Sequence, residues 1–303
     1  ALLGVLPLIL YLQKQQQETR SKAAQSTSLF FTPSTTTTQP FAITPMKEFS
    51  LDLMMNPGSN AVSYAKIEIL WDSTHIEPSS TITPVQINTT AFPQILEGGP
   101  IVDNNRIYFA ISVGSDTSKS IKQPVKVATI NFRSRATPTA SPVQIGFGVV
   151  EMLSTAPTDQ ANENVYAGGQ SAFVVVDDFN LNGQVIQDLN CNGKYDSATE
   201  DPVPANFGYN ITLTKAGVSY PLGHNDNGTA QFFNFKLTRG TYVVTYTNPP
   251  VGRPVNFPPG NPPVYTVTLG PDCAILPIGG DGNCFSSGHI LNLNFALQTT
   301  PAP

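Results

Sequence analysis

The chain has 303 residues, of which only 12% are charged, and its formal net charge is −5. No cluster of Lys and Arg is present that could neutralise nucleic-acid phosphates, so the composition excludes a nucleic-acid-binding class. The 27 Pro and 23 Gly residues, together with abundant Thr, Asn and Ser, are typical of secreted or surface β-proteins rather than cytosolic enzymes. A chain of this length can form two ordinary domains, each with its own core.

The first 25 residues predict a helix with an apolar start. Residues 1–12 are apolar and residues 13–24 are polar and favour a helix. Twelve helical residues span about 18 Å, which is short of the roughly 20 residues that a bilayer core needs. The chain begins with Ala rather than Met, so we expect processing, leaving either half of a membrane anchor or a helix that bundles with copies of itself. The side chains expected to pack are Leu2, Leu3, Val5, Leu6, Leu8, Ile9, Leu10 and Leu12.

The next segment, residues 26–45, is rich in Thr, Ser and Pro and has no helical periodicity. This composition predicts an extended linker or stalk. Phe30 and Phe31 stand out in it. We expect them to dock onto the following domain rather than to face water.

Residues 46–176 alternate apolar and polar side chains with a period of two, which predicts strands with one buried face. Pro, Asn and Gly separate these short runs, and no long amphipathic helix interrupts them. The pattern therefore predicts an antiparallel β-sandwich. The clearest runs are residues 49–53, 65–71, 107–113, 125–132 and 143–147.

This stretch resembles the cohesin-like family of β-sandwich modules. The resemblance lies in the early strand at residues 49–55 and in residues 65–72, where the family has a strand that ends in an aromatic residue and Asp. It continues at residues 127–132 and 162–165. Cohesins bind dockerin modules in cellulose-degrading complexes, but this sequence contains no dockerin repeat and no glycosidase domain. The resemblance therefore implies the fold, and leaves the ligand of the module open.

Residues 177–298 form the expected second β-domain, and they contain a loop with metal-ligand spacing. After the strand-like residues 183–187, oxygen side chains occupy loop positions 1, 3, 5 and 9, with Gly193 at position 6. Ca²⁺ takes six to eight oxygen ligands, and a glycine at position 6 permits the sharp turn. The expected ligands are Asp188, Asn190, Asn192, the carbonyl oxygen of Lys194, Asp196 and Glu200.

The acid that should complete this loop is displaced. A bidentate acid is expected at position 12, but that position falls on Thr199, and Glu200 follows one residue later. Either the loop bulges, or Glu200 or Asp201 supplies the carboxylate in a different geometry. Two side-chain ligands are Asn, so we expect a modest affinity. The alternative is an Asn/Gly-rich β-turn without an ion, but four oxygen positions and the acids that follow favour structural Ca²⁺.

The second domain resembles the calcium-binding B-type repeat of bacterial surface adhesins (SdrD-like). In that family a strand leads into an Asp-x-Asn-x-Asn/Asp-Gly loop, an acidic residue and a Pro-rich turn. This chain matches at residues 183–196 and 200–204, and later strands match at residues 209–214, 228–233 and 240–246. The resemblance implies a module that calcium stiffens outside the cell.

Three cysteines are too few for a disulfide scaffold. Cys273 and Cys284 bracket an eleven-residue step rich in Gly and Pro, which a disulfide could close. Cys191 would then be left over, but its pairing with either of the other two stays open. Acceptor sequences for N-linked glycans occur at Asn88, Asn210 and Asn227.

No pattern in the sequence indicates an enzyme. The nucleophile-elbow, zinc-protease and phosphate-binding glycine motifs are all absent. The three histidines occur in turn-like contexts and are expected to be ordinary loop residues. They are His75, His224 and His289.

The expected fold is mostly β, with an N-terminal helix plus two tandem antiparallel β-sandwich domains of the Ig/cohesin-like kind. Residues 1–25 are expected to form the helix, residues 26–45 the linker and residues 299–303 a tail. The two sandwiches are expected at residues 46–176 and 177–298.

Two functions fit this plan, both place the protein outside the cell or at its surface, and the sequence favours the first. In the first, it is the subunit of a filament that resembles a type IV pilin in plan, with membrane contact during biogenesis and copies of itself as partners. Bacterial type IV pilins usually have a glutamate near the start of the apolar run. This glutamate is absent here, and position 5 is Val5. In the second, it is a membrane-anchored adhesin whose cohesin-like module, on a calcium-stiffened stalk, binds a protein or a carbohydrate.

Overall fold

The computed structural model describes the chain in segments: residues 25–155, 164–190, 192, 194–196, 198–200, 202, 210–225, 230–247, 255–260, 262–278, 282–285 and 288–298. The chain divides into two compact units. The first comprises Ala1–Phe41 and Met46–Val175, and the second comprises Ala42–Pro45 and Val176–Pro303. Each unit is built from two β-sheets.

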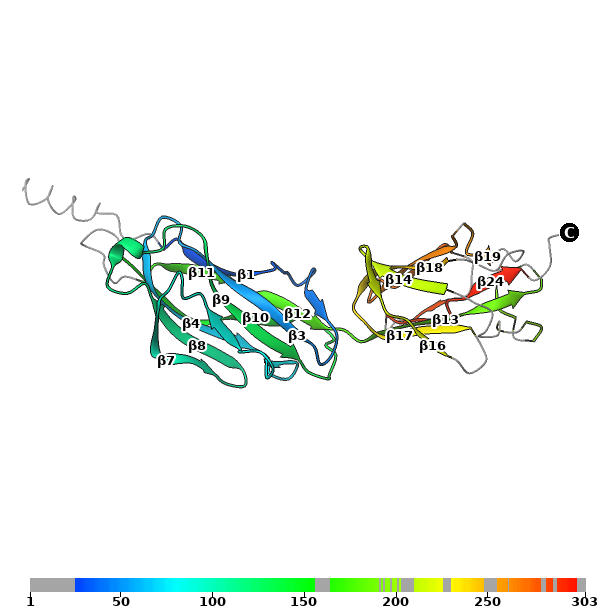
Figure 1. Cartoon of the computed structure of the whole chain (residues 1–303), viewed down its shortest axis with the longest axis horizontal. Helices are drawn as coiled ribbons and strands as arrows, with labels where there is room; N and C mark the ends of the chain where they lie inside the picture. The colour runs from blue at the N-terminus through cyan, green and yellow to red at the C-terminus, as the bar shows by residue number, and fades with distance from the viewer. Residues whose placement is uncertain are drawn as a thin grey trace, which may run out of the picture. The chain divides into compact units, whose positions relative to one another are not determined.

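The first sheet of the first unit has the strand order β11-β1-β3-β9-β5, and β6 also pairs with β9 (Figure 1). β1 lies antiparallel to β3 but parallel to β11. The sheet is therefore not purely antiparallel. Its strands are β1 (Thr27–Thr32), β3 (Glu48–Asn56), β5 (Ile76–Pro78), β6 (Val85–Ile87), β9 (Val125–Ser134) and β11 (Tyr166–Gln170).

The second sheet has the order β2-β12-β10-β4-β8-β7 and belongs to the first unit apart from residues 42–43 of β2 and Val176 of β12. A bulge interrupts the pairing of β10 with β4 between Phe147 and Val150. A short 3-10 helix, Thr117–Lys119, lies in the connection that leaves β8. The strands are β2 (Phe41–Ile43), β4 (Val62–Trp71), β7 (Gln94–Val102), β8 (Arg106–Ser112), β10 (Val143–Ser154) and β12 (Ala172–Val176).

Alternating side chains from the two sheets form the core of the first unit. On β4, Ala65, Ile67 and Ile69 are fully buried, while the residues between them are partly exposed. Trp71 of β4 packs edge-on against Phe132 of β9, with ring centroids 5.2 Å apart. Because these two strands belong to different sheets, the contact crosses the core, as a β-sandwich requires.

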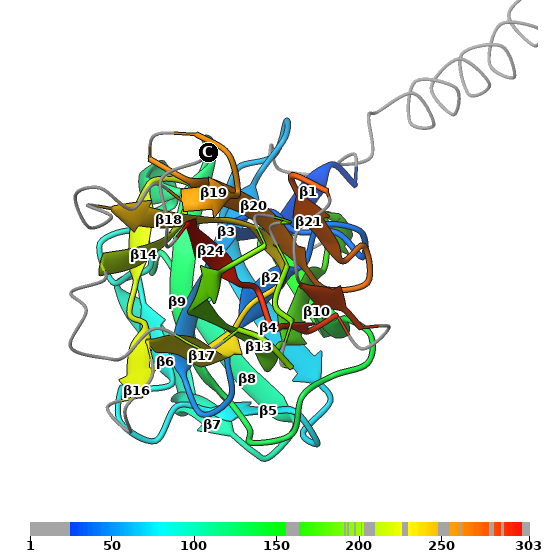
Figure 2. The same ribbon diagram turned by 90° about the vertical axis from the view of Figure 1, so that its right-hand side faces the viewer.

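The second unit also consists of two sheets. One has the order β16-β17-β13-β23-β22, and β24 pairs with both β13 and β19. The other has the order β15-β14-β18-β20-β21, and Figure 2 shows β18 between β14 and β20. The strands of the first of these sheets are β13 (Phe179–Asp188), β16 (Gly223–Asn225), β17 (Gln231–Leu237), β19 (Val255–Phe257), β22 (Asn283–Cys284), β23 (Ile290–Leu291) and β24 (Phe295–Gln298). Those of the second are β14 (Asn210–Lys215), β15 (Val218–Tyr220), β18 (Gly240–Thr247), β20 (Val264–Leu269) and β21 (Ala274–Leu276).

An aromatic cluster fills the core of the second unit. Phe295 of β24 packs edge-on against Tyr265 of β20 and Tyr246 of β18, with ring centroids 5.1 and 5.6 Å away. All three side chains are fully buried. Burying an aromatic side chain contributes about 1.5–3 kcal/mol, so this cluster is a main contribution to the stability of the unit.

Two expectations need correction. The fold class with an N-terminal helix is wrong, because the part of the chain that the structure describes is all β apart from the turn at Thr117–Lys119. Residues 1–24 of the helix expected at residues 1–25, with its packing side chains Leu2 to Leu12, lie outside the described residues. No helix among the described residues is long and apolar enough to cross a membrane.

The expected linker at residues 26–45 is not a linker along its whole length, because β1 and β2 pair within the sheets. The reason is local: Thr27, Leu29 and Phe31 alternate with more exposed residues and are buried. Phe31 stacks on Phe147 with ring centroids 5.0 Å apart, so it docks as expected. The limits given above for the domains otherwise stay predictions.

Candidate metal loop and candidate binding face

The candidate metal loop begins where β13 ends. Asp188 is the last residue of β13, and its side chain is fully buried. The strand is held between β17 and β24, and its inward side chains Leu181 and Val185 belong to the core. The position of the first expected ligand is therefore fixed by the sandwich rather than by the loop.

Side-chain oxygens of the loop accept hydrogen bonds from the loop's own backbone. Asp188 Oδ1 and Asn190 Oδ1 both accept the N–H of Asn192, at 3.1 and 3.0 Å. Asn192 Oδ1 in turn accepts the N–H of Lys194 at 2.7 Å. Two expected ligand oxygens therefore lie next to the same nitrogen, and consecutive Asx turns wind the chain around them.

Glu200 joins the two ends of the loop. Its side chain is only 2% exposed. Oε1 accepts the backbone N–H of Leu189 at 3.0 Å, and Oε2 accepts that of Asp196 at 2.9 Å. Thr199, which occupies position 12, is exposed. The structure thus brings the displaced acid back to the loop and leaves the residue at the expected position in solvent.

The donor set fits a hard cation in its chemistry, because it consists of carboxylate, amide and carbonyl oxygens. Among the described residues, no group of three or more His, Cys, Asp or Glu side chains is arranged to hold a metal ion. The expected set contains three carboxylates, Asp188, Asp196 and Glu200, and the structure does not bring them together as such a group. Asp188 and Glu200 are both buried, and backbone N–H groups of the loop already donate to them. A cation would add the positive charge that two buried carboxylates favour.

Several expected site residues lie apart from this loop or outside the described part of the chain. Asn88 is engaged in the first unit, where its Nδ2 donates to the carbonyl oxygen of Lys126 at 2.8 Å. Asn210 is exposed at the start of β14. The residues outside the described part are Cys191, Gly193, Asp201 and Asn227.

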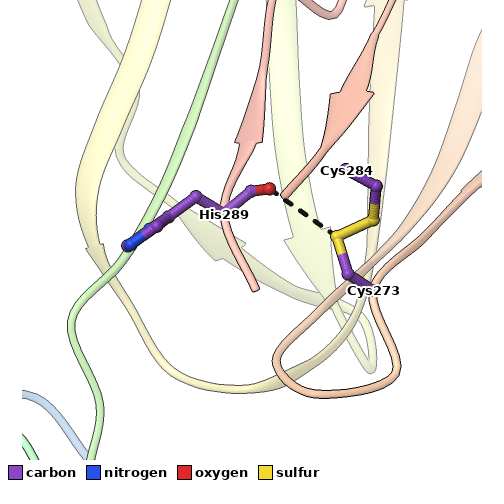
Figure 3. Close-up of a disulfide and its surroundings, with 3 residues drawn as sticks. All are labelled: Cys273, Cys284 and His289. Carbon is purple, nitrogen blue, oxygen red and sulfur yellow. Dashed lines mark hydrogen bonds between the residues drawn. A yellow bond between two sulfur atoms is a disulfide. The ribbon is translucent and has the colours of Figure 1, made fainter. Parts of the chain in front are cut away.

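A disulfide joins Cys273 to Cys284 in the second unit (Figure 3). It links the start of β21 to β22, and the carbonyl oxygen of His289 lies 3.6 Å from Cys273 Sγ. The ring of His289 is occupied as well, because its Nδ1 accepts the N–H of Asn180 at 3.0 Å. His289 therefore has a structural role in this corner of the sandwich.

The second candidate site is the outer face of β4, β8 and β10 with the edge strand β7, which we call the outer face. Alternation turns Tyr64, Lys66, Glu68 and Leu70 of β4 away from the core. Tyr108 lies opposite Glu68, and Ile101 lies opposite Tyr108. Three apolar side chains are exposed on this face: Leu70 (38%), Ile101 (48%) and Val149 (65%).

Charged pairs surround these apolar side chains. Lys66 Nζ lies 3.5 Å from Glu97 Oε1 and 5.2 Å from the centroid of the Tyr108 ring. Tyr108 donates its hydroxyl to Glu97 at 2.5 Å, and this hydrogen bond, helped by Lys66, lowers the pKa of Glu97. Glu68 accepts the backbone N–H of Val149 at 2.9 Å. This hydrogen bond fixes the bulge of β10. It therefore also positions Val149, which is the most exposed apolar side chain of the outer face.

The sequence reasoning did not identify the outer face as a site. No motif marks it, because its residues come from four strands that are far apart in the chain. The signal for this site in the sequence lies in the outward-facing positions of β4. Tyr64 and Leu70 occupy two of them, where small polar residues would be expected.

Comparison with known proteins gives structural likenesses only. No family model matches the chain, and no curated protein matches it. Among solved structures, the chain is similar to the seventh ScaB type I cohesin from Pseudobacteroides cellulosolvens, with 13% identity and a TM-score of 0.39 over 50% of this chain and 92% of that one.

Two further cohesins show the same degree of likeness. The non-cellulosomal cohesin from Archaeoglobus fulgidus is 13% identical, with a TM-score of 0.35 over 52% of this chain and 92% of that one. A type I cohesin–dockerin complex from Clostridium thermocellum matches at 11% identity and a TM-score of 0.38, over 50% of this chain and 93% of that one. Half of the chain is thus similar to cohesin modules, while the sandwich itself is established by the strand pairing described above.

Proposed function

We propose that the first unit is a protein-binding module that uses the outer face, and that the second unit is a rigid module stiffened by structural Ca²⁺. Both act outside the cell or at its surface. The observation that carries the proposal is the outer face itself, where exposed Leu70, Ile101 and Val149 accompany Tyr64 and Tyr108 within a rim of ion pairs.

This chemistry is that of a protein interface. Interface centres are more apolar than the rest of the surface and are enriched in aromatic residues such as Tyr, and their rims are polar. Four charged residues of the outer face are paired with one another, Arg106 with Glu68 at 3.7 Å and Lys66 with Glu97 at 3.5 Å. These pairs hold the long side chains of the outer face in place. The outer face therefore loses less conformational entropy when a partner binds.

Extracellular location is supported by the disulfide between Cys273 and Cys284. Disulfides persist in oxidising compartments and are rare in the cytosol. The low charge content and abundance of Thr, Asn and Pro favour the same location.

The proposed Ca²⁺ would be held by Asp188, Asn190, Asn192, the carbonyl oxygen of Lys194, Asp196 and Glu200. The support is the burial of Asp188 and Glu200 together with the closure of the loop by Glu200. Bound there, the ion would neutralise two buried carboxylates and fix the turn that follows β13. Its role would be structural, and we expect no catalytic activity from it.

The filament subunit is not the function that we propose. Its core depended on a helix at residues 1–25, and residues 1–24 lie outside the described part of the chain. Negative-stain electron microscopy of the purified full chain gives a direct check. Long ordered filaments would contradict the binding-module proposal, and dispersed particles would agree with it.

The binding role is tested with a matched pair of variants of the full chain. Val149→Asp places a charge in the outer face, whereas Ile82→Asp makes the same change at another exposed apolar residue of the first unit, 42% exposed. Each protein is immobilised and exposed to a surface-protein extract of the source organism, and captured proteins are quantified by mass spectrometry. The captured partner is then purified, and its dissociation constant is measured by calorimetry.

We expect Val149→Asp to weaken binding at least tenfold, which corresponds to about 1.4 kcal/mol, and Ile82→Asp to leave it unchanged. Equal binding by both variants would show that the outer face is not the binding surface. A wild-type chain that retains no protein above the level of a blank matrix would contradict the binding role itself.

A further inference from the structure

We propose that a groove on the second unit binds a neutral carbohydrate. The groove consists of two adjacent hollows of about 180 and 380 Å³, which share Gln184, Asn292 and Asn294 in their walls. Ligand sites in proteins usually have volumes of about 300–1,000 Å³, so the larger hollow alone is in that range. This inference concerns a different unit from the protein-binding role proposed above and does not depend on it.

The walls of the groove are built mainly from amide side chains. They come from β13, from β17, from β22 and from the segment that joins β23 to β24. Among the described residues that line the two hollows, Lys194 is the one charged side chain. The amides are Asn182, Gln184, Gln231, Asn283, Asn292 and Asn294.

Amide side chains suit a ligand that carries many hydroxyl groups. Each amide presents one carbonyl acceptor and two N–H donors in a plane, and a hydroxyl group both donates and accepts. Neighbouring hydroxyls of a sugar ring can therefore be bound in pairs. A strongly charged ligand would find only Lys194 as an opposite charge, and a purely apolar ligand would leave the amides unpaired, which is unfavourable.

The amide side chains of the groove have two roles. Some can bind a ligand, and others form hydrogen bonds that fix the wall of the groove. Asn182 Oδ1 accepts the backbone N–H of Asn292 at 2.9 Å, which fixes the segment between β23 and β24 against β13. The side chains of Gln184 and Asn283 make no hydrogen bond to another described residue, and Asn283 is exposed. Both of these amides can therefore bind a ligand.

Aromatic rings lie at the same groove. Phe233 and Phe235 are two residues apart on β17, so they lie on the same face of the strand. Their rings stack with centroids 4.8 Å apart. Phe235 is 50% exposed, so its ring is accessible beside the amides. Tyr195 lines the larger hollow. The flat C–H face of a sugar ring can pack against an exposed aromatic ring, while its hydroxyls reach the amides at the edge.

The groove is rigid on the side of β22 and β23. Asn283 precedes Cys284, which the disulfide ties to Cys273 (Figure 3), and Asn283 pairs with Leu291 in the sheet. On the floor, a Cβ atom at Gly183 would overlap the carbonyl oxygen of Leu293. Glycine thus allows the segment that carries Asn292 and Asn294 to lie directly against β13. A wall fixed in this way binds with a smaller loss of conformational entropy.

The test is isothermal titration calorimetry on the full chain with defined oligosaccharides. The probes are four neutral hexasaccharides, namely the α1,4-, β1,4- and β1,3-linked glucose hexamers and a β1,4-linked mannose hexamer. An anionic hexamer of galacturonic acid serves as the charged comparison. We expect at least one neutral hexamer to bind, and the anionic hexamer to bind at least tenfold more weakly than that one.

Two exposed residues of the groove then identify the site. Phe235→Ala and Asn283→Ala are each expected to weaken the binding of that neutral hexamer at least fivefold, with an unchanged melting temperature. Val218→Ala, at a residue of β15 that is 61% exposed, is the matched control and is expected to change nothing. Val149→Asp in the first unit is also expected to leave sugar binding intact, so this result and the protein-binding test remain distinguishable.

The proposal is overturned if none of the four neutral hexamers binds. It is equally overturned if both groove variants bind like the wild type, or if the anionic hexamer binds as tightly as the neutral ones. If Phe235→Ala lowers the melting temperature, Asn283→Ala decides the question alone, because its side chain is exposed and makes no hydrogen bond to a described residue.

Discussion

The hydroxyl of Tyr265 donates to the carbonyl oxygen of Asn294 at 2.7 Å, so the polar tip of this fully buried side chain is satisfied inside the second unit. Tyr246 packs against the same ring, Phe295, with its centroid 5.6 Å away. Its hydroxyl oxygen, however, is buried and has no hydrogen-bond partner among the described residues. Two tyrosines of one aromatic cluster thus differ in whether burial of the hydroxyl is compensated.

This difference predicts opposite effects for the same substitution. Tyr246→Phe removes an unsatisfied buried hydroxyl and is expected to raise the free energy of unfolding by about 1 kcal/mol, whereas Tyr265→Phe removes a hydrogen bond and is expected to lower it by about 1 kcal/mol. Urea unfolding of the second unit, followed by tyrosine circular dichroism, measures both. A loss of stability in Tyr246→Phe would contradict the prediction.

Alkaline pH is expected to destabilise the second unit. Burial raises the pKa of both Tyr242 and Tyr246 to about 12. The unfolded chain releases these phenolic protons near pH 10 while the folded chain keeps them, so the stability present below pH 10 is lost as the pH rises to 12. Burial also lowers the pKa of Lys215, and this shift makes the stability rise with pH instead. One lysine acts in this direction, whereas two tyrosines act in the other.

Unfolding free energies measured in urea at several pH values between 10 and 12 test this. We expect a steady fall in the wild type and a shallower fall in Tyr246→Phe. A flat profile, or one with the same slope in both proteins, would be the contrary result.

Removal of calcium is expected to destabilise the second unit alone. An ion bound only to the folded state stabilises it by about 2.7 kcal/mol at a hundredfold excess over its dissociation constant. The single tryptophan of the chain, Trp71, lies in the first unit, so its fluorescence follows the unfolding of that unit. Differential scanning calorimetry with and without EDTA should show a lower melting temperature for the second unit, while the Trp71 transition stays in place.

Glu200→Gln provides the matched variant for this experiment. Gln preserves the shape of the side chain but removes its charge and one acceptor oxygen, so the variant is expected to lose most of the response to EDTA. Glu97→Gln in the first unit is the control. A wild-type melt that is identical before and after full removal of metal would eliminate the structural ion.

The ion pair between Arg239 and Asp177 is expected to be among the strongest single contributions in the second unit. The Asp177 side chain is 1% exposed and lies 2.8 Å from Arg239 Nη2, and Asp177 Oδ2 also accepts the backbone N–H of Arg239 at 2.8 Å. Arg239→Ala would leave a buried carboxylate without its cation, which typically costs about 3–5 kcal/mol. Arg239→Lys should restore only part of this, because a lysine cannot form the two-pronged contact.

The measurement is the urea midpoint of the second unit in the two variants. Arg106→Ala, read at the urea midpoint of the first unit, is the control, since the Arg106 side chain is 45% exposed in its pairs with Asp103 and Glu68 and should contribute less than about 1 kcal/mol. Equal losses in Arg239→Ala and Arg106→Ala would contradict the prediction.

Reduction of the disulfide is the last prediction. Cys273 and Cys284 are 11 residues apart, and a disulfide that closes a loop of this size contributes about 2–3 kcal/mol, mainly through the unfolded chain. The Cys273→Ser/Cys284→Ser double variant should melt at a lower temperature than the oxidised wild type and should not respond to a reductant. If the oxidised wild type and the double variant melted at the same temperature, a stabilising disulfide would be ruled out.

The strands could be predicted from the sequence, but their partners could not. The alternation at residues 49–53 and 65–71 identifies β3 and β4 because one side chain in two is buried. The parallel neighbours β1 and β11 are separated by more than a hundred residues, so local periodicity contains no information about their contact. For the same reason, composition led us to expect a linker where β1 lies in the sheet.

The candidate sites divide in the same way. The metal loop is contiguous, so spacing alone could locate Asp188, Asn190 and Asn192. What spacing could not show is that Glu200, one residue late, reaches back to the N–H of Leu189. The outer face and the amide groove are assembled from distant strands, and neither has a motif.

The parallel pairing of β13 with β24 has a mechanical consequence. β13 is the first strand of the second unit and β24 its last described strand, and they pair from Val185 opposite Phe295 to Asp188 opposite Gln298. A pull on the two ends of the unit would slide these strands past each other, so that their hydrogen bonds are loaded together rather than opened one by one. The unit would then resist stretching far better than a sheet that unzips from one end, which is a useful property in a protein under tension.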